Sequence, residues 1–223
     1  MIYVSGGIKG GSGKTTVATN LAIGLTISGK EMLLVDADDQ ESATDFTSWR
    51  NQTLEGNSGY TAVQLNGMNV RQQVMALSQK YEDIVIDTGG RDTESQRAAL
   101  TVADVALFPF EPRSLNIWTI EKLSKLLTEI YTINQNLKAY AFINKADHYG
   151  KDNDSTSGIL QENKTFHFLK TSLGNRKSFA NAATLGLGVI ELVPKDQKAI
   201  DEFSELFFEI TQTKLCRSKK EVA

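Results

Sequence analysis

The apolar residues of this chain fall into short continuous runs, and most runs are followed by a stretch with helical spacing. Short apolar runs bounded by polar residues are typical of buried parallel strands, whereas apolar residues at i, i+4 and i+8 are typical of helices packed on a sheet. On this basis we expect strands at residues 2–4, 32–35, 60–65, 83–87, 102–108, 137–143, 166–169 and 188–192.

Helical spacing predicts helices over about residues 14–28, 70–80, 115–131, 176–184 and 196–215, and Gly29 is placed to end the first of them. Residues 147–165 are polar and glycine-containing, so we expect a long loop or a short helix at the surface. This alternation predicts a single doubly wound α/β domain over residues 1–223, with a mostly parallel sheet, helices on both faces, and a less ordered tail from about residue 214.

The first expected strand and helix are joined by a glycine-rich stretch, Lys9-Gly10-Gly11-Ser12-Gly13-Lys14-Thr15-Thr16. Its glycines allow the backbone to curl and to point successive N–H groups inward, at the positive end of a helix. Lys14 would bring an ammonium to the β- and γ-phosphates of a nucleotide, and the Thr15 hydroxyl would bind Mg²⁺. The stretch therefore predicts a loop that holds a nucleoside triphosphate.

This stretch resembles the deviant Walker A motif of the ParA/MinD ATPases, in which a lysine precedes the glycine pair. The strict phosphate-loop pattern would place glycine at position 8, where this chain has Ile8. The resemblance implies that Lys9 crosses a dimer interface to the phosphates of the other subunit. It also implies that the ligands are ATP and Mg²⁺ and that the ATP-bound protein is a homodimer.

Asp87 ends the expected strand at 83–87 and begins a D-x-x-G run. An acid at the end of such a strand is placed to hold Mg²⁺ directly or through a water. In the same run, the N–H of Gly90 would sense the γ-phosphate and reorient after hydrolysis.

A second pair of acids, Asp36 and Asp38, alternates across the end of the strand at 32–35, so that one can face the Mg²⁺ and the other the attacking water. Residues 34–40 resemble the D-x-D-P-Q switch of the ParA group, with Asp39 in place of proline. The resemblance implies that Asp38 orients or activates the water and that Gln40 belongs to the same switch.

The strand at 137–143 is followed by Asn144-Lys145-Ala146-Asp147, which has the N-K-x-D form with which GTPases read guanine. Related ATPases place a polar residue here against adenine. Asn144 and Lys145 are therefore expected near the base under either interpretation, and we favour ATP because the match in the phosphate loop is longer.

Two later stretches extend the resemblance to the small plasmid ParA proteins. Residues 108–118 resemble their P-x-x-P-S-x-x-D-x-W segment, with Asn116 at the usual aspartate, and residues 185–195 resemble their C-terminal end. In that family the C-terminal third binds DNA without sequence specificity, through phosphate contacts. The candidate residues here are Arg176, Lys177, Lys195 and Lys198, although interspersed acids also fit an ordinary solvated face.

Composition narrows the possible functions. The net charge of −3 excludes a globally basic nucleic-acid binder, so any DNA contact must be local. The one cysteine, Cys216, excludes an intrachain disulfide and a cluster of the nitrogenase iron protein type, which takes two cysteines per subunit. His148 and His167 lack metal-ligand spacing. Without a leader or a bilayer-length apolar run, we expect a cytoplasmic protein that associates with the nucleoid when ATP is bound.

These features predict a ParA-type ATPase whose ATP-bound dimer binds DNA, and whose slow hydrolysis is stimulated by a ParB-like or other small partner protein. The cycle would drive plasmid or chromosome partition, or cargo positioning. A conjugation or cargo-positioning accessory ATPase of the same family would share every motif. A MinD-like switch would place the last helix on a membrane, but core packing explains its apolar face more simply. A metabolic P-loop enzyme, such as a dethiobiotin synthetase-like ligase, would need an acceptor pocket, and Lys9 argues against it.

Overall fold

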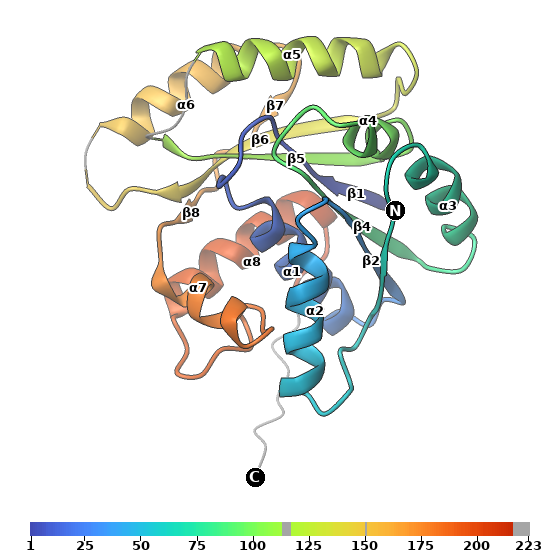
Figure 1. The fold of residues 1–223 in the computed structure, drawn as a ribbon. Helices are drawn as coiled ribbons and strands as arrows, with labels where there is room; N and C mark the ends of the chain where they lie inside the picture. Colours follow the sequence, from blue (N-terminus) through green and yellow to red (C-terminus); the bar gives the residue numbers. More distant parts are fainter. Residues whose placement is uncertain (113–116, 150, 216–223) are drawn as a thin grey trace.

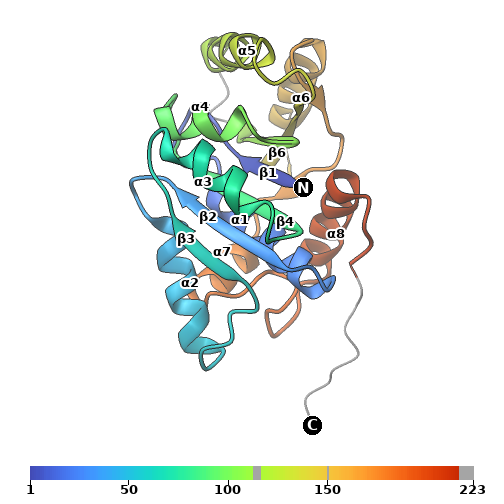
Figure 2. The same cartoon turned by 90° about the vertical axis from the view of Figure 1, so that its right-hand side faces the viewer.

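The computed structural model describes residues 1–112, 117–149 and 151–215. Its centre is an eight-stranded sheet with the strand order β3-β2-β4-β1-β5-β6-β7, and β8 pairs with β6. The paired strands run parallel throughout the described residues. Helices cover both faces of the sheet (Figures 1 and 2), so the predicted doubly wound α/β fold is confirmed.

The strands follow the apolar runs closely. Their bounds are β1 Ile2–Ser5, β2 Met32–Ala37, β3 Thr61–Gln64, β4 Asp83–Thr88, β5 Val105–Phe110, β6 Lys138–Ala146, β7 His167–Phe168 and β8 Leu173–Gly174. Every residue of β1, β2, β4 and β5 is buried, because a layer of helices covers each face. Strands buried in this way must be apolar on both sides, which is why they were visible as unbroken runs.

One helix layer consists of α1 Lys14–Ile27, α2 Ser42–Thr53, α7 Lys177–Thr184 and α8 Gln197–Thr211. The apolar face of α8 is buried in the same core as α1, through Ile200, Phe203, Leu206, Phe207 and Ile210. This packing uses the surface that a membrane-binding helix would need. Among the described residues, no helix has the length and apolarity that crossing a bilayer requires. Cys216 and the basic residues after it lie outside the described residues.

The opposite layer consists of α3 Asn69–Leu77, α4 Glu94–Leu100, α5 Ile117–Tyr131 and α6 Asp152–Glu162. Helix α6 lies in the segment for which a loop or a short helix was expected, and it buries Thr156 and Leu160. Residues 113–116, which include the start predicted for α5 and Asn116 of the ParA-like segment, lie outside the described residues.

The expected strand at 188–192 is wrong. The segment forms turns instead, because its backbone groups are bound by side chains and do not join the sheet. The N–H of Gly188 donates to the carboxylate of Glu191 at 2.9 Å, and the N–H of Val189 donates to the side chain of Asn20 at 2.8 Å. Helices α2 and α4 were not predicted.

Candidate nucleotide-binding site

The phosphate loop leaves β1 and enters α1 at Gly13, which has φ 91°. The end of β6 braces this loop from the side. The side-chain amide of Asn144 donates to the carbonyl of Ser12 at 2.7 Å, and the ammonium of Lys145 donates to the carbonyl of Gly11 at 2.5 Å. Both residues of the N-K-x-D run therefore hold the loop in shape, and their predicted contact with a base stays a prediction.

Lys14 lies at the start of α1, with most of its side chain buried. Its ammonium donates to the carbonyl of Lys9 at 3.3 Å, so the side chain curls over its own loop. Burial lowers the pKa of Lys14, and the nearby carboxylates of Asp87 and Asp38 raise it. The cation is thus held where phosphate groups would meet the loop.

An open cleft of about 690 Å³ joins this loop to the ends of β2, β4 and β6. This volume is within the range of small-molecule sites. The residues that line it are Gly10, Gly11, Gly13, Lys14, Thr15, Thr16, Asp38, Asp39, Gln40, Ser42, Gly89, Gly90, Arg91, Thr93 and Lys145. Most of the predicted site residues thus meet in one cleft. Ser12, Asp36, Asp87 and Asn144 are buried next to it, and Lys9 is exposed beside it.

Asp87 is completely buried, and neither of its carboxylate oxygens has a hydrogen-bond partner of ordinary geometry among the described residues. Burial raises its pKa to about 7, and the nearby Thr15 hydroxyl and the Lys14 ammonium act in the opposite direction. Two unpaired, buried carboxylate oxygens are unusual and call for an explanation. Since hard cations prefer oxygen ligands, Asp87 and the Thr15 hydroxyl fit a Mg²⁺ ion.

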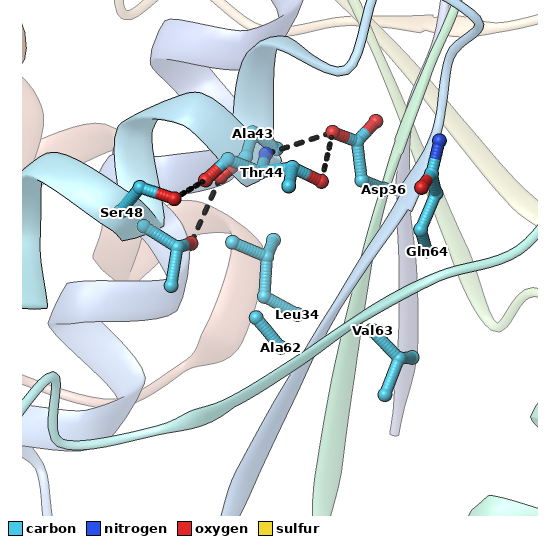
Figure 3. A pocket seen from close by; sticks show the side chains of 9 residues that line it. Leu34, Asp36, Ala43, Thr44, Ser48, Ala62, Val63 and Gln64 are labelled. Atoms are coloured by element: carbon cyan, nitrogen blue, oxygen red, sulfur yellow. Dashed lines mark hydrogen bonds between the residues drawn. The ribbon is translucent and has the colours of Figure 1, made fainter.

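Asp36 anchors the beginning of α2 (Figure 3). One of its carboxylate oxygens accepts hydrogen bonds from the backbone N–H and the hydroxyl of Thr44, both at 2.8 Å, and the other accepts from the N–H of Asp38 at 3.2 Å. Beside this anchor lies a small pocket of about 160 Å³, between α2 and strands β2 and β3. Asp36 thus fixes the switch segment after β2, and its role as a metal ligand stays a prediction.

Asp38 is half-buried at the cleft and accepts a hydrogen bond from the N–H of Gln40 at 3.2 Å. Gly90 packs directly on the phosphate loop, because a Cβ at Gly90 would lie 2.7 Å from the Cα and the N of Gly10. The D-x-x-G run and the loop therefore touch backbone to backbone. A group that enters between them must move one of them, which suits a sensor of the γ-phosphate.

A family model described as the CobQ/CobB/MinD/ParA nucleotide binding domain matches residues 4–199. The chain belongs to this family. The match includes the phosphate loop, both acid-ended strands and the N-K-x-D run. Membership makes the chain a nucleotide-binding protein of the ParA/MinD group, as the deviant Walker A motif indicated.

Individual family members resemble the chain over nearly its whole length. Maintenance of carboxysome distribution protein A of Halothiobacillus neapolitanus is 24% identical over 91% of this chain and 93% of its own. The solved ATP complex of a Cyanothece McdA variant has a TM-score of 0.74 at 16% identity, covering 93% of this chain and 95% of that one. A putative plasmid partition protein of Borrelia burgdorferi bound to AMPPNP has a TM-score of 0.69 at 19% identity, covering 93% of this chain and 98% of that one. At these identities the structures establish the fold.

Sequence reasoning missed Gln96, which connects the loop of this ParA/MinD-family site to β4. The side-chain carbonyl of Gln96 accepts hydrogen bonds from the N–H of Gly7 at 2.8 Å and from the Thr88 hydroxyl at 3.0 Å. Its amide nitrogen is buried without a partner among the described residues. No signal pointed to Gln96, because α4 itself was not predicted.

The four basic residues proposed for DNA binding separate into two kinds. Arg176 forms an ion pair with Glu202, at 2.9 and 2.5 Å, and Glu202 also accepts from the N–H of Gly174. Glu202 of α8 thus holds both β8 and Arg176, the residue before α7. The other three, Lys177, Lys195 and Lys198, are exposed near the starts of α7 and α8, which are joined by a 2.9 Å hydrogen bond from Ser178 to Asp196.

Replacing Gly13 with alanine is expected to lower nucleotide affinity by at least about tenfold, which corresponds to 1.4 kcal/mol. A Cβ at Gly13 would lie 2.1 Å from the amide nitrogen of Asn144, so the brace on the loop must give way. Gly29 is a matched control because it has φ 85° and no atom within 4 Å of its Cβ position. Gly29→Ala should cost stability but leave the affinity for a fluorescent ATP analogue unchanged. Equal affinities of the two variants would contradict the prediction.

Proposed function

We propose that this chain is a ParA-type ATPase that forms an ATP-dependent sandwich dimer, binds DNA nonspecifically and hydrolyses ATP slowly to partition DNA or to position a cargo. The observation that supports this most is the cleft in which Lys14, Thr15, Asp38 and Gly90 meet beside the completely buried Asp87. Phosphoryl transfer needs these parts: a loop that binds the phosphates, a site for Mg²⁺, a group that positions the attacking water and a sensor of the γ-phosphate.

Each residue has a defined part in hydrolysis. The N–H groups of the glycine-rich loop and the Lys14 ammonium bind and orient the phosphates, and the hydroxyl of Thr15 with Asp87 would hold Mg²⁺. When bound, Mg²⁺ would supply positive charge that offsets the negative charge developing on the phosphates. Asp38 positions the attacking water and accepts its proton. Gly90 moves with the γ-phosphate and reports its loss.

Lys9 is the residue that would make the dimer depend on ATP. It is exposed beside the open cleft, in a loop whose carbonyl already receives Lys14. A lysine that reaches the phosphates of the other subunit can do so only when those phosphates are present. ATP would therefore act as the bridge between two copies of the chain, and hydrolysis would release them.

Lys9→Ala is expected to abolish the dimer that the wild-type chain forms with Mg²⁺ and a non-hydrolysable ATP analogue. Light scattering after size exclusion measures the mass with the analogue, with the GTP analogue and without nucleotide. Lys80→Ala is the control, since Lys80 is exposed near the start of β4, at the edge of the sheet away from the loop. A wild-type chain that stays monomeric in every condition, or a dimer that survives Lys9→Ala, would overturn the proposal.

The exposed lysines Lys177, Lys195 and Lys198 support nonspecific DNA binding, because phosphate contacts need accessible cations on one surface. The ion pair of Arg176 makes it a weaker candidate than these three. We propose cargo positioning alongside partition because the relative from Halothiobacillus neapolitanus is named for carboxysome distribution. A small ParB-like or other partner protein would stimulate hydrolysis.

A further inference from the structure

Arg91 follows the sensor residue Gly90 directly, and its side chain lines the nucleotide cleft. It is exposed there, and it forms no hydrogen bond or ion pair with the described part of the chain. The two lysines that line the same cleft differ in this respect. The ammonium of Lys14 donates to the carbonyl of Lys9, and that of Lys145 donates to the carbonyl of Gly11. Arg91 therefore brings unused donors to the cleft.

The backbone on both sides of Arg91 is fixed. On one side, Gly90 lies against Gly10 of the phosphate loop. On the other side, Asp92 binds the guanidinium of Arg97 through two hydrogen bonds of 2.6 Å, and Arg97 also binds Glu129 of α5 at 2.6 Å. Thr93 then caps α4 by accepting from the N–H of Gln96. Arg91 is thus a single residue between two anchored points, at the end of the cleft where the γ-phosphate sensor lies.

We infer that Arg91 binds the γ-phosphate of the nucleotide held by its own subunit and stabilises the charge that develops there during hydrolysis. The inference rests on the proposed ATPase function and adds a residue to it. A guanidinium presents two parallel N–H donors that match phosphate oxygens, and in phosphoryl transfer such an arginine neutralises the equatorial oxygens. ADP lacks the group that Arg91 would contact, so its affinity should not depend on this residue.

A different use of Arg91 is also testable. On its other side, Arg91 lines a groove of about 420 Å³ in which Arg97 is paired with the acids Asp92 and Glu129, and in which Lys122 and Lys125 are exposed. An acidic segment of a partner protein would suit this groove. Lys125 is exposed in the groove but does not line the nucleotide cleft, so Lys125→Ala tests the groove without touching the phosphates.

The test compares the Kd values of wild type, Arg91→Ala, Arg91→Lys and Lys125→Ala for Mg²⁺-ADP and for the Mg²⁺ complex of a non-hydrolysable ATP analogue. Arg91→Ala should raise the Kd for the ATP analogue by about tenfold and change the Kd for ADP by less than about twofold. Arg91→Lys should recover part of the affinity, because an ammonium keeps the charge but not the paired donors. Hydrolysis by Arg91→Ala should fall more than the affinity does, since arginines of this kind contribute about 10³–10⁵-fold. Lys125→Ala should match wild type.

Repeating the Kd measurements in Lys9→Ala protein separates contact within one subunit from contact across a dimer. In the Lys9→Ala background, Arg91→Ala should still lower the affinity for the ATP analogue by the same factor. Equal losses for ADP and the analogue, no loss for either, a similar loss in Lys125→Ala, or a loss that disappears with Lys9→Ala would each overturn the inference. If the wild-type chain hydrolyses ATP and the Arg91→Ala variant binds and hydrolyses it equally well, only this inference is refuted. A wild-type chain that binds neither nucleotide would refute the proposed function as well.

Discussion

Asp38→Ala is expected to slow ATP hydrolysis by about 10²- to 10⁴-fold, the contribution of a positioned general base, while the protein still binds ATP. The side chain is half-buried at the cleft and accepts one hydrogen bond, from the N–H of Gln40. It makes no hydrogen bond to the phosphate loop within the described residues, so its removal leaves the cradle for the phosphates in place. Phosphate release under steady-state conditions measures the rate, and a fluorescent ATP analogue measures the affinity.

Asp39 provides the control for this prediction. It lines the same cleft, has the same side chain and is exposed, but the ParA-like switch assigns no role to it. Asp39→Ala should change the hydrolysis rate by less than about twofold, because an exposed charge is largely screened. If Asp38→Ala lowered ATP affinity and hydrolysis to the same extent, Asp38 would be a binding residue and its assignment to the water would be wrong.

The central strands and the phosphate loop were predictable for two different reasons. Strands such as β2 and β4 are buried on both faces, so the fold requires them to be apolar, and a run of apolar residues is visible without any alignment. The loop was predictable because its chemistry requires glycines and a lysine at fixed spacing. Both signals are local in the sequence, and neither depends on what the residues meet after folding.

The features that sequence reasoning missed depend on contacts between distant residues. Helix α2 is polar and buries only four of its residues, so it lacks a strong apolar stripe. The metal-ligand role of Asp36 stays a prediction, but nothing in the sequence showed that Thr44 would bind the same carboxylate. Arg91 carried a usable signal, since it follows the D-x-x-G run directly. The ion pair between the buried Arg50 and Glu191 joins residues 141 positions apart and gave no signal.

Arg50 connects helix α2 to the segment before α8. It is 3% exposed, and its guanidinium binds Glu191 through two hydrogen bonds of 2.7 and 2.9 Å. It also donates to the carbonyls of Ser58 at 2.7 Å and Gly186 at 3.0 Å. Gly186 sits so close that a Cβ there would lie 2.1 Å from the backbone N of Arg50. The guanidinium thus satisfies two carbonyls and one carboxylate in an interior position.

Arg50→Ala is therefore expected to lower the free energy of unfolding by about 3–5 kcal/mol, because it leaves a carboxylate and two carbonyls without their donor. Urea unfolding of the full chain measures this. Arg97→Ala is the matched control, since Arg97 makes equally short ion pairs but is 40% exposed, and surface pairs contribute about 0–1 kcal/mol. The double variant Arg50→Met, Glu191→Leu should be more stable than Arg50→Ala, because no charge is left unpaired. Equal costs at Arg50 and Arg97 would show that burial does not set the strength of this connection between α2 and the C-terminal third.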